Sequence, residues 1–453
     1  MRILHYSLGF PPYRTGGLTK YCTDLMLEQK DQGHEVALIW PGRINLLKKK
    51  TEICSGKKWN DIGNYELVNP LPVPLDEGII DIDAFTKKVD ESIYLRFLKY
   101  YNPDVIHIHT LMGLHEEFIW AANKLGITTV FTSHDYFGIC PKVTLFYHGS
   151  ACDHDGDCKE CVQCNKTALS INKITILQSS IYRRLKDTSV IKILRKRHRQ
   201  EFFDDSIVLK EEANEEAKAR DYIKLRQYYV SMLEMVDIIH FNSSISEAVY
   251  KKYINPKNSA MIPITHRDVK DHRQLKNFEY GKLRITYLGP AKPFKGFQFL
   301  LGVLDRMWDK DIREFELHIY SETREDRPYI SIKQNGYPYD QLQEIFYNTD
   351  VLVVPSQWYE TFGFTVLEAL SYGVPVISSD IVGAADIDGV VRFKHDDSKE
   401  LETKIRELLK SKERRIELNS KYLGMDFSQF LMKNHIRQIE MLYNIQSSRE
   451  KKE

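Results

Sequence analysis

The sequence contains no apolar stretch long enough to cross a membrane, and its first residues lack the apolar core of a signal peptide. Its net charge is only +1, which gives no overall attraction to nucleic acid or to anionic lipid. Internal repeats of short period and low-complexity tracts are also lacking. These absences favour a cytoplasmic protein that does not bind nucleic acid, and any contact with the inner face of a membrane has to come from a local patch.

Two ligand-binding signatures are also missing. The dinucleotide fingerprint Gly-x-Gly-x-x-Gly is absent, which argues against a nicotinamide cofactor. Asp153, Asp155 and Asp157 have the spacing of a calcium loop, but no glycine stands at the sixth position, and Cys164 replaces the glutamate that should close the loop. We therefore exclude a calcium site.

What is present is enough apolar sequence to build large cores. The 453 residues are 42% hydrophobic and 28% charged, as in soluble globular proteins, and a chain of this length is expected to form two or more domains.

Apolar runs alternate with segments of helical spacing in two series, and such alternation predicts α/β domains with parallel sheets. In the first series the predicted strands are 3–6, 36–40, 105–109, 128–131 and 236–241; in the second they are 285–288, 315–320, 330–332, 351–354 and 374–377. We therefore predict a Rossmann-like domain over 1–265 with an irregular insertion over about 136–227, a linker over 266–281, a second Rossmann-like domain over 282–426, and a terminal helix within 427–453.

A pair of glycines follows the first predicted strand. Gly16 and Gly17 would let the backbone approach a ligand closely and would leave the N-terminus of the next helix open to a phosphate. By itself such a pair is usually just a turn.

Two glutamates eight positions apart lie in the most informative segment of the chain. The apolar run Val351–Val354 predicts a buried strand, and the apolar spacing from Phe364 to Gly373 predicts a helix. Glu360 then precedes this helix and Glu368 lies in its second turn. The amides near Phe362, Gly363 and Phe364 would face a diphosphate, with the two carboxylates on either side of it.

This segment resembles the Glu-x7-Glu motif of the family 4 retaining glycosyltransferases. The resemblance implies the α/β GT-B fold, in which two Rossmann-like domains face a central cleft, here with a cysteine-rich and basic insertion in the first domain. It also implies that Glu360 binds the sugar hydroxyls, that Glu368 binds the ribose, and that the glycine pair lies beside the donor phosphates and the acceptor. In this family the last helix often crosses back to the first domain.

Two further segments are similar to motifs of the same family. The sequence Thr132-Ser-His134-Asp135 resembles the segment whose histidine meets the donor sugar, and His109 and Asp135 are weaker candidates nearby. The segment 289–296 resembles a glycine-rich loop whose arginine and lysine bind the diphosphate. Lys295 matches the lysine, but Pro290 replaces the arginine, and Lys292 is the alternative second cation.

The resemblance implies a complete set of roles and ligands. The catalytic candidates are His134, Lys295 and Glu360, and the donor-binding candidates are Gly16, Gly17, Lys292, Phe362, Gly363, Phe364 and Glu368. The donor is expected to be a nucleotide-diphosphate sugar, UDP first and GDP second, and transfer is expected to need no metal. The acceptor is expected to be a glycan or a lipid-linked glycan in the synthesis of cell-surface polysaccharide or glycoconjugate. A non-catalytic GT-B subunit and a sugar-nucleotide epimerase are the alternatives.

Five of the seven cysteines lie within 25 positions, at Cys140, Cys152, Cys158, Cys161 and Cys164. The Cys-x2-Cys spacing suits a structural zinc, and Cys-x2-Cys-x2-Cys also suits an iron–sulfur cluster. We expect Cys152, Cys158, Cys161 and Cys164 as the ligands; reduced thiols without metal are the alternative.

A basic segment over 181–200 interleaves apolar residues with arginines and lysines. Such a segment can lie on an anionic membrane surface, although a solvated helix face is the commoner explanation.

Overall fold

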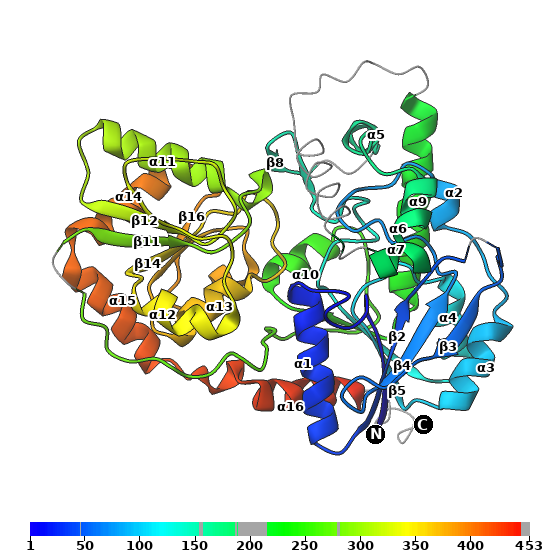
Figure 1. Ribbon diagram of the computed structural model, residues 1–453. Helices are drawn as coiled ribbons and strands as arrows, with labels where there is room; N and C mark the ends of the chain where they lie inside the picture. Colours follow the sequence, from blue (N-terminus) through cyan, green and yellow to red (C-terminus); the bar gives the residue numbers. More distant parts are fainter. Residues whose placement is uncertain (46, 154–156, 186–187, 189–214, 279–280, 445–453) are drawn as a thin grey trace.

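The computed structural model describes residues 1–45, 47–153, 157–185, 188, 215–278 and 281–444 (Figure 1). The chain forms two α/β domains, each built around its own sheet of mostly parallel strands, as the sequence predicted. Among the described residues, no helix is both long enough and apolar enough to cross a membrane.

The first domain contains an eight-stranded sheet in the order β10-β9-β6-β5-β1-β2-β4-β3. Its strands are β1 (Arg2–Tyr6), β2 (Glu35–Pro41), β3 (Glu52–Ser55), β4 (Gly63–Val68), β5 (Val105–Ile108), β6 (Thr128–Thr132), β9 (Ile238–Phe241) and β10 (Ser259–Met261). All pairings are parallel except that of β3 with β4. The central strands are buried along almost their whole length, because helices cover both faces of a parallel sheet.

The helices of this domain follow the strand ends. They are α1 (Gly17–Asp31), α2 (Ile82–Phe85), α3 (Ser92–Tyr101), α4 (Glu116–Lys124), α5 (Lys159–Cys164), α6 (Ile171–Leu177), α7 (Ser180–Leu185), α9 (Glu215–Met235) and α10 (Ser244–Tyr250). A small ribbon, β7 (Phe146–Tyr147) with β8 (Ser150–Ala151), lies in the cysteine segment.

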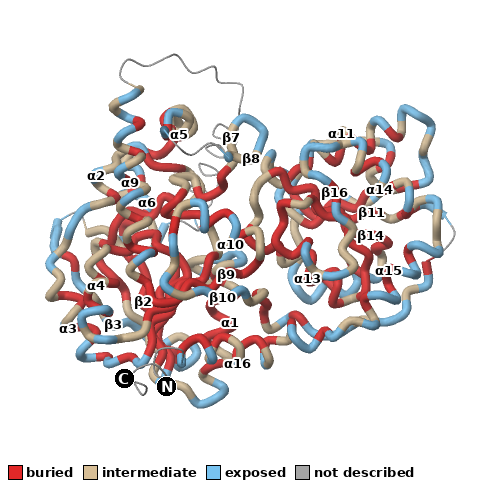
Figure 2. Tube along the Cα trace, turned by 180° about the vertical axis from the view of Figure 1, so that it is seen from behind, coloured by how far each residue is buried: buried red, intermediate tan, exposed pale blue. Residues whose placement is uncertain are grey.

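The second domain contains a six-stranded parallel sheet in the order β13-β12-β11-β14-β15-β16. Its strands are β11 (Leu283–Tyr287), β12 (Phe315–Ile319), β13 (Ile330–Lys333), β14 (Val351–Val354), β15 (Val376–Ser379) and β16 (Val391–Phe393). Its helices are α11 (Phe297–Asp309), α12 (Leu342–Tyr347), α13 (Phe364–Ser371), α14 (Ser398–Lys410) and α15 (Lys412–Gly424), with short 3-10 turns η1 (Pro293–Lys295), η2 (Tyr339–Gln341), η3 (Gly383–Asp386) and η4 (Phe427–Phe430). In Figure 2 the buried part of the trace follows the strands of both sheets.

The last helix returns to the first domain. α16 (Met432–Tyr443) packs against α1, where Tyr21 Oη and His435 Nε2 are 2.9 Å apart and Gln29 Nε2 donates to Tyr443 Oη at 3.0 Å. Both residues of α1 are fully buried under α16. The first domain is thus completed by residues that follow the second domain in the sequence (Figure 1).

The described part of the region predicted as an irregular insertion shares the core of the first domain. Cys158, Val162 and Ile174 belong to the same buried cluster as the strands. The expected end of the insertion near 227 falls inside α9, whose Tyr229 and Leu233 are buried in that cluster. The buried positions of α9 recur at helical spacing, but the charged residues between them led us to extend the insertion into this helix.

The predicted membrane segment over 181–200 lies mostly outside the described residues. Its described part is the end of α7, where Ile181 and Leu185 are exposed. Arg183 instead turns inward, pairs with Glu66 at 3.0 Å and lies over the rings of Tyr13 and Trp40.

Candidate active site

The loop between β14 and α13 carries the first half of the candidate site. Its backbone is tied to the neighbouring turn, since Glu360 N donates to Ile381 O at 2.9 Å. Gly363 caps α13 with φ +96°, and a Cβ there would lie 2.8 Å from Val382 Cγ1, so glycine is required. The first N–H groups of α13 therefore begin at a rigid, glycine-capped turn, where unpaired donors and the helix dipole favour an anion.

Lys295 and Glu360 meet at the edge of this loop. Lys295 Nζ lies 2.6 Å from Glu360 Oε1, and Ser356 Oγ donates to Glu360 Oε2 at 2.7 Å. Gly296 makes this approach possible, because a Cβ at this position would lie 1.7 Å from the carbonyl oxygen of Pro355. Lysine and glutamate, predicted to bind different parts of one donor, neutralise each other in the structure.

Glu368 lies deeper and is almost fully buried. Its Oε1 is 3.1 Å from His266 Nε2, and the His266 ring makes edge contacts with Tyr339 and Phe364. The predicted linker therefore begins with a buried histidine that holds Glu368 from the side of the first domain. Nothing in the local sequence distinguished His266, because its partners Glu368, Tyr339 and Phe364 lie far from it in the chain.

His134 of the first domain contacts the loop that carries Glu360. Its carbonyl oxygen accepts a hydrogen bond from Thr361 Oγ1 at 3.0 Å, one residue after Glu360. The start of α1 also reaches the second domain, since a Cβ on Gly17 would lie 3.4 Å from the ring of Phe364. The glycine pair, His134 and the Glu-x7-Glu loop therefore come together across the domain boundary.

Burial controls the titration of the groups around His134. Desolvation lowers the pKa of His134 and of His109 well below the ordinary value, and neighbouring imidazoles lower it further. Desolvation raises the pKa of Asp135 to about 6, although a bond from the Phe137 amide opposes the shift. The site thus presents neutral imidazoles near its centre.

Lys292, the expected second cation, forms an ion pair with the first domain. Its Nζ pairs with Asp76 of the first domain at 2.9 Å. Pro290, at the position of the family arginine, is exposed, and its carbonyl accepts from Tyr287 Oη at 2.8 Å. In this arrangement Lys295 is the cation that lies at the loop.

A second acidic group near Glu368 already holds a cation. The ligand atoms of Asp24, His266 and Asp268 lie within 4.8 Å of one another. Lys20 Nζ lies 2.6 Å from both carboxylates, which supplies the charge that a metal would bring.

Profiles of two glycosyltransferase families match the chain, one in each domain. The family described as Glycosyltransferase Family 4 matches residues 15–151, and the family described as Glycosyl transferases group 1 matches residues 282–411. Together these ranges cover more than half of the chain. The chain belongs to glycosyltransferase family 4. Its Gly-Gly loop and His134 fall in the first matched range, and Lys295 and both glutamates fall in the second.

This family 4 chain is also similar to a curated protein over a short stretch and to solved structures over almost its whole length. An uncharacterised 41.2 kDa protein in the cps region of Klebsiella pneumoniae is 30% identical over 111 residues, which are 23% of this chain and 30% of that protein. The match thus spans less than a third of the relative's length. Among solved structures, sucrose-phosphate synthase from Thermosynechococcus elongatus superposes with a TM-score of 0.60 at 14% identity over 99% of both chains. The Anabaena protein HepE, solved with UDP and glucose, gives 0.56 at 10% identity over 98% of this chain and all of its own. These structures share the GT-B fold.

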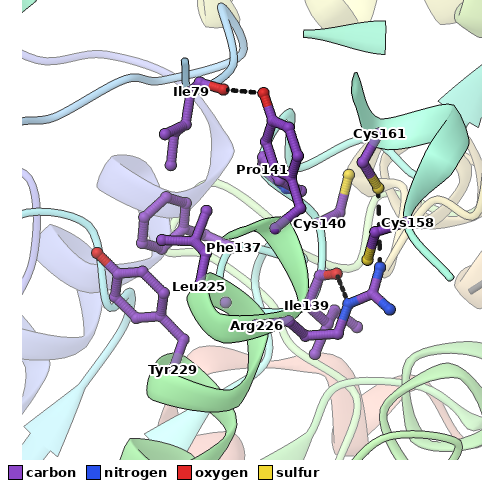
Figure 3. Close-up of a pocket in the computed structure, with 12 residues that line it drawn as sticks. Ile79, Phe137, Ile139, Cys140, Pro141, Cys158, Cys161, Leu225, Arg226 and Tyr229 are labelled. Atoms are coloured by element: carbon purple, nitrogen blue, oxygen red, sulfur yellow. Dashed lines mark hydrogen bonds between the residues drawn. The ribbon is translucent and has the colours of Figure 1, made fainter. Parts of the chain in front are cut away.

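The cysteine segment contains a small cavity of about 10 Å³ in the first domain (Figure 3), and its Asp153 accepts a hydrogen bond from Tyr359 Oη, next to Glu360, at 2.7 Å. Cys140, Cys158 and Cys161 line the cavity, the sulfur atoms of Cys158 and Cys161 contact each other, and Arg226 Nη2 lies 3.8 Å from Cys161 Sγ. Two groups of side chains among the described residues bring three metal-ligand atoms within 4.8 Å of one another, and neither includes a cysteine. The predicted metal site stays a prediction, and the sulfur atoms would have to move together to hold an ion.

Proposed function

We propose that the protein is a retaining glycosyltransferase that moves a sugar from a nucleotide-diphosphate sugar to a glycan or lipid-linked acceptor in cell-surface polysaccharide or glycoconjugate synthesis. The observation that carries the proposal is the junction at Thr361, where the Glu-x7-Glu loop binds the backbone of His134. This junction gathers groups suited to a sugar and groups suited to a diphosphate in one place.

The chemistry of these groups fits departure of a nucleoside diphosphate. The glycine-capped start of α13 and the Lys295 ammonium would stabilise the negative charge that develops on the leaving phosphate. Glu360 would then exchange its bond with Lys295 for bonds to sugar hydroxyls. His134 would contact the sugar from the first domain.

Retention is proposed through a front-face displacement assisted by the leaving phosphate. A glycosidase-like nucleophile would need a second carboxylate about 5 Å from the first, at the reacting carbon. Glu368 is instead buried against His266, where it fits a ribose or a structural role better than attack on the sugar.

The proposed donor is a UDP-sugar, supported by the fold neighbour that was solved with UDP and glucose. The proposed place of the product, cell-surface polysaccharide, is supported by the relative in the cps region of Klebsiella pneumoniae.

A non-catalytic GT-B subunit is the second candidate. Pro290 replaces an arginine of the family motif, and Lys292 is paired with Asp76, so the diphosphate would meet fewer cations than in a typical member.

The first test is thermal stabilisation by UDP, GDP and ADP, measured on wild type, Glu368→Ala and Glu407→Ala. Glu407 is an exposed glutamate of α14 in the same domain and serves as the matched control. We expect one nucleotide to raise the melting temperature of wild type and Glu407→Ala but not of Glu368→Ala, since a ligand of the native state adds RT ln(1 + [L]/Kd) to its stability.

Incubation with the sugar form of that nucleotide then separates the candidates. A new glycosidic bond with the donor's anomeric configuration supports the proposal. An inverted product, an isomerised donor, or binding without turnover contradicts it, and binding without turnover supports the non-catalytic subunit.

A further inference from the structure

A row of buried histidines connects the last helix to His134. His5, His107, His109 and His240 are fully buried in the first domain, between the sheet and the helices α1 and α16. The rings of His5, His107, His109 and His134 stack on one another, with centroid distances of 4.3 Å for His107 with His109 and 5.4 Å for His109 with His134. The hydrogen bonds along this row form one continuous chain.

The first half of the chain begins at a backbone carbonyl. His240 Nε2 lies 2.8 Å from the carbonyl oxygen of Ile262, so this nitrogen must carry a proton. In a neutral ring His240 Nδ1 is then an acceptor, and Thr132 Oγ1 donates to it at 2.9 Å. The Thr132 oxygen in turn accepts from His107 Nε2 at 2.7 Å, which leaves His107 Nδ1 to accept from Tyr443 Oη at 2.8 Å.

The second half of the hydrogen-bond chain runs from Tyr443 to His134. Because the Tyr443 hydroxyl donates its one proton to His107, its oxygen accepts from Gln29 Nε2 at 3.0 Å, and the other end of that amide must be an acceptor. His5 Nε2 therefore donates to Gln29 Oε1 at 2.7 Å, His109 Nε2 donates to His5 Nδ1 at 3.0 Å, and His134 Nε2 donates to His109 Nδ1 at 3.2 Å.

One fixed acceptor thus determines every proton in the row. All five imidazoles have the proton on Nε2, and no second consistent assignment exists while the rings are neutral. Burial lowers the pKa of His240 and of His5 to about 4 and that of the other rings well below the ordinary value, so the rings are neutral at pH 7.

A metal is not needed to explain the row. The ligand atoms of His5, His107 and His109 lie within 4.8 Å of one another. Each ring nitrogen of these three residues already has a hydrogen-bond partner, so no lone pair is left for an ion.

We propose that this chain, oriented by the Ile262 carbonyl and by Tyr443 of α16, holds His134 as the neutral Nε2–H tautomer and leaves Nδ1 as an acceptor for a hydroxyl proton of the ligand. Tyr443, Gln29, His5 and His109 are positioning residues, since each acts on His134 through its neighbour. The inference rests on the proposed function only for the identity of the ligand, which would be the sugar part of the donor. An acceptor nitrogen repels a phosphate oxygen and matches a hydroxyl.

The direct test is the tautomer of His134, read from one-bond and long-range proton–nitrogen correlations of the histidine rings in the 15N-labelled full chain. The His134 signals are identified by their loss in His134→Ala. We expect Nε2–H and an unprotonated Nδ1 in wild type. Nδ1–H in wild type overturns the proposal. This readout needs neither donor nor turnover, so its failure is distinct from failure of the proposed function.

Tyr443→Phe interrupts the hydrogen-bond chain between His107 and Gln29, and this variant has a matched control. Without its hydroxyl the Gln29 amide is no longer held, and His5, His109 and His134 should populate both tautomers. Tyr21→Phe makes the same substitution in the same α1–α16 interface, but its hydroxyl bonds to His435, which is not a link of the chain. It should lose a similar amount of stability while the His134 proton stays on Nε2. Equal tautomers in Tyr443→Phe and wild type overturn the proposal.

If Tyr443→Phe does not fold, Gln29→Met breaks the chain at the next link with a side chain of similar length, and the same tautomer change is expected. A ligand measurement completes the test. His134→Ala should leave UDP affinity within about twofold but weaken a UDP-sugar about tenfold, the size of one lost hydrogen bond. A tenfold loss for UDP itself contradicts an acceptor role for Nδ1.

Discussion

Glu360 is the residue whose partner in the structure differs most from its expected ligand. It accepts bonds from Lys295 and from Ser356, so the donor would have to replace the Lys295 bond. A lysine–glutamate pair that is only about one-fifth exposed holds both side chains in place before a ligand arrives. The negative charge of Glu360 then sets how strongly Lys295 attracts a diphosphate.

Glu360→Gln should therefore have opposite effects on UDP binding and on sugar transfer. Removing this charge near Lys295 should tighten binding of UDP several-fold, since the carboxylate no longer competes with and repels the diphosphate. Sugar transfer should fall, because the amide accepts fewer hydroxyl bonds. Calorimetric titration with UDP and initial rates of transfer measure the two effects. Weaker UDP binding in this variant would contradict a competing role for Glu360.

Lys295→Ala should lower turnover more than binding. The ammonium is aimed at charge that appears as the diphosphate leaves, and loss of one such donor typically costs about 100-fold or more in kcat. The exposed Lys399→Ala in the same domain is the control, since it removes the same charge at a distance from the loop. Rates at saturating donor give kcat, and equilibrium titration gives the affinity. Wild-type turnover in Lys295→Ala would remove it from the catalytic residues.

The predicted helices and strands agree with the structure where local sequence determines the backbone conformation. The apolar run Val351–Val354 predicted a buried strand and forms one, and Gly373 ends α13 because its left-handed φ of +72° stops a helix. Edge elements were missed: β3 has no buried residue, so no apolar run marks it. α3 was missed although its apolar face is regular, because no turn signal separates it clearly from the segment before it.

The contacts that complete the site could not be predicted from sequence. Glu368 gains its partner His266 only when the linker folds onto the second domain, and Lys292 gains its partner Asp76 only when the two domains pack together. Local sequence placed the glutamates and Lys295 at the right strand end, but pairing across more than 100 residues depends on tertiary structure.

The cysteine segment yields a prediction about metal content. Cys158 has a left-handed backbone with φ +55° at the start of α5, which turns its sulfur toward Cys161, and Arg226 beside them would offset thiolate charge. We expect the purified protein to carry zinc or iron on Cys152, Cys158, Cys161 and Cys164.

Elemental analysis and visible absorption test this, and chelation should lower the melting temperature. Cys158→Ser should lose the metal, whereas Cys54→Ser, outside the cluster, should keep it. Protein without zinc or iron, and unaffected by a chelator, would show that the cysteines are plain buried thiols.

The whole molecule should be sensitive to acid because of its buried histidines. Burial lowers the pKa of His5 and His240 to about 4 and of His435 to about 3, and it lowers that of His107, His109 and His134 as well. The unfolded chain binds these protons near pH 6.5, so stability is complete above that pH and is lost as pH falls toward 4.

Each such histidine removes about 1.4 kcal/mol per pH unit in that range. Asp135 acts in the opposite direction, since its pKa is raised to about 6 and its folded form binds a proton first, but it is one group against several. Urea unfolding at pH 7.5, 6.5 and 5.5 should show a falling free energy of unfolding, and His435→Leu should make the fall less steep. Equal stability at the three pH values would contradict burial of these histidines in their neutral form.

The return of α16 to the first domain makes synthesis and folding of this chain a nested process. On the ribosome the sheet of the first domain emerges early. The hydrogen bonds of Gln29, His107 and Tyr21 to α16 can form only later, because α16 emerges after all of β11 to α15. At roughly 5–20 residues per second this delay is on the order of ten seconds. During that interval the buried imidazoles and the apolar face of α1 are open to water. A nascent chain stalled before residue 432 should therefore bind chaperones through its first domain, although the second domain has already been made.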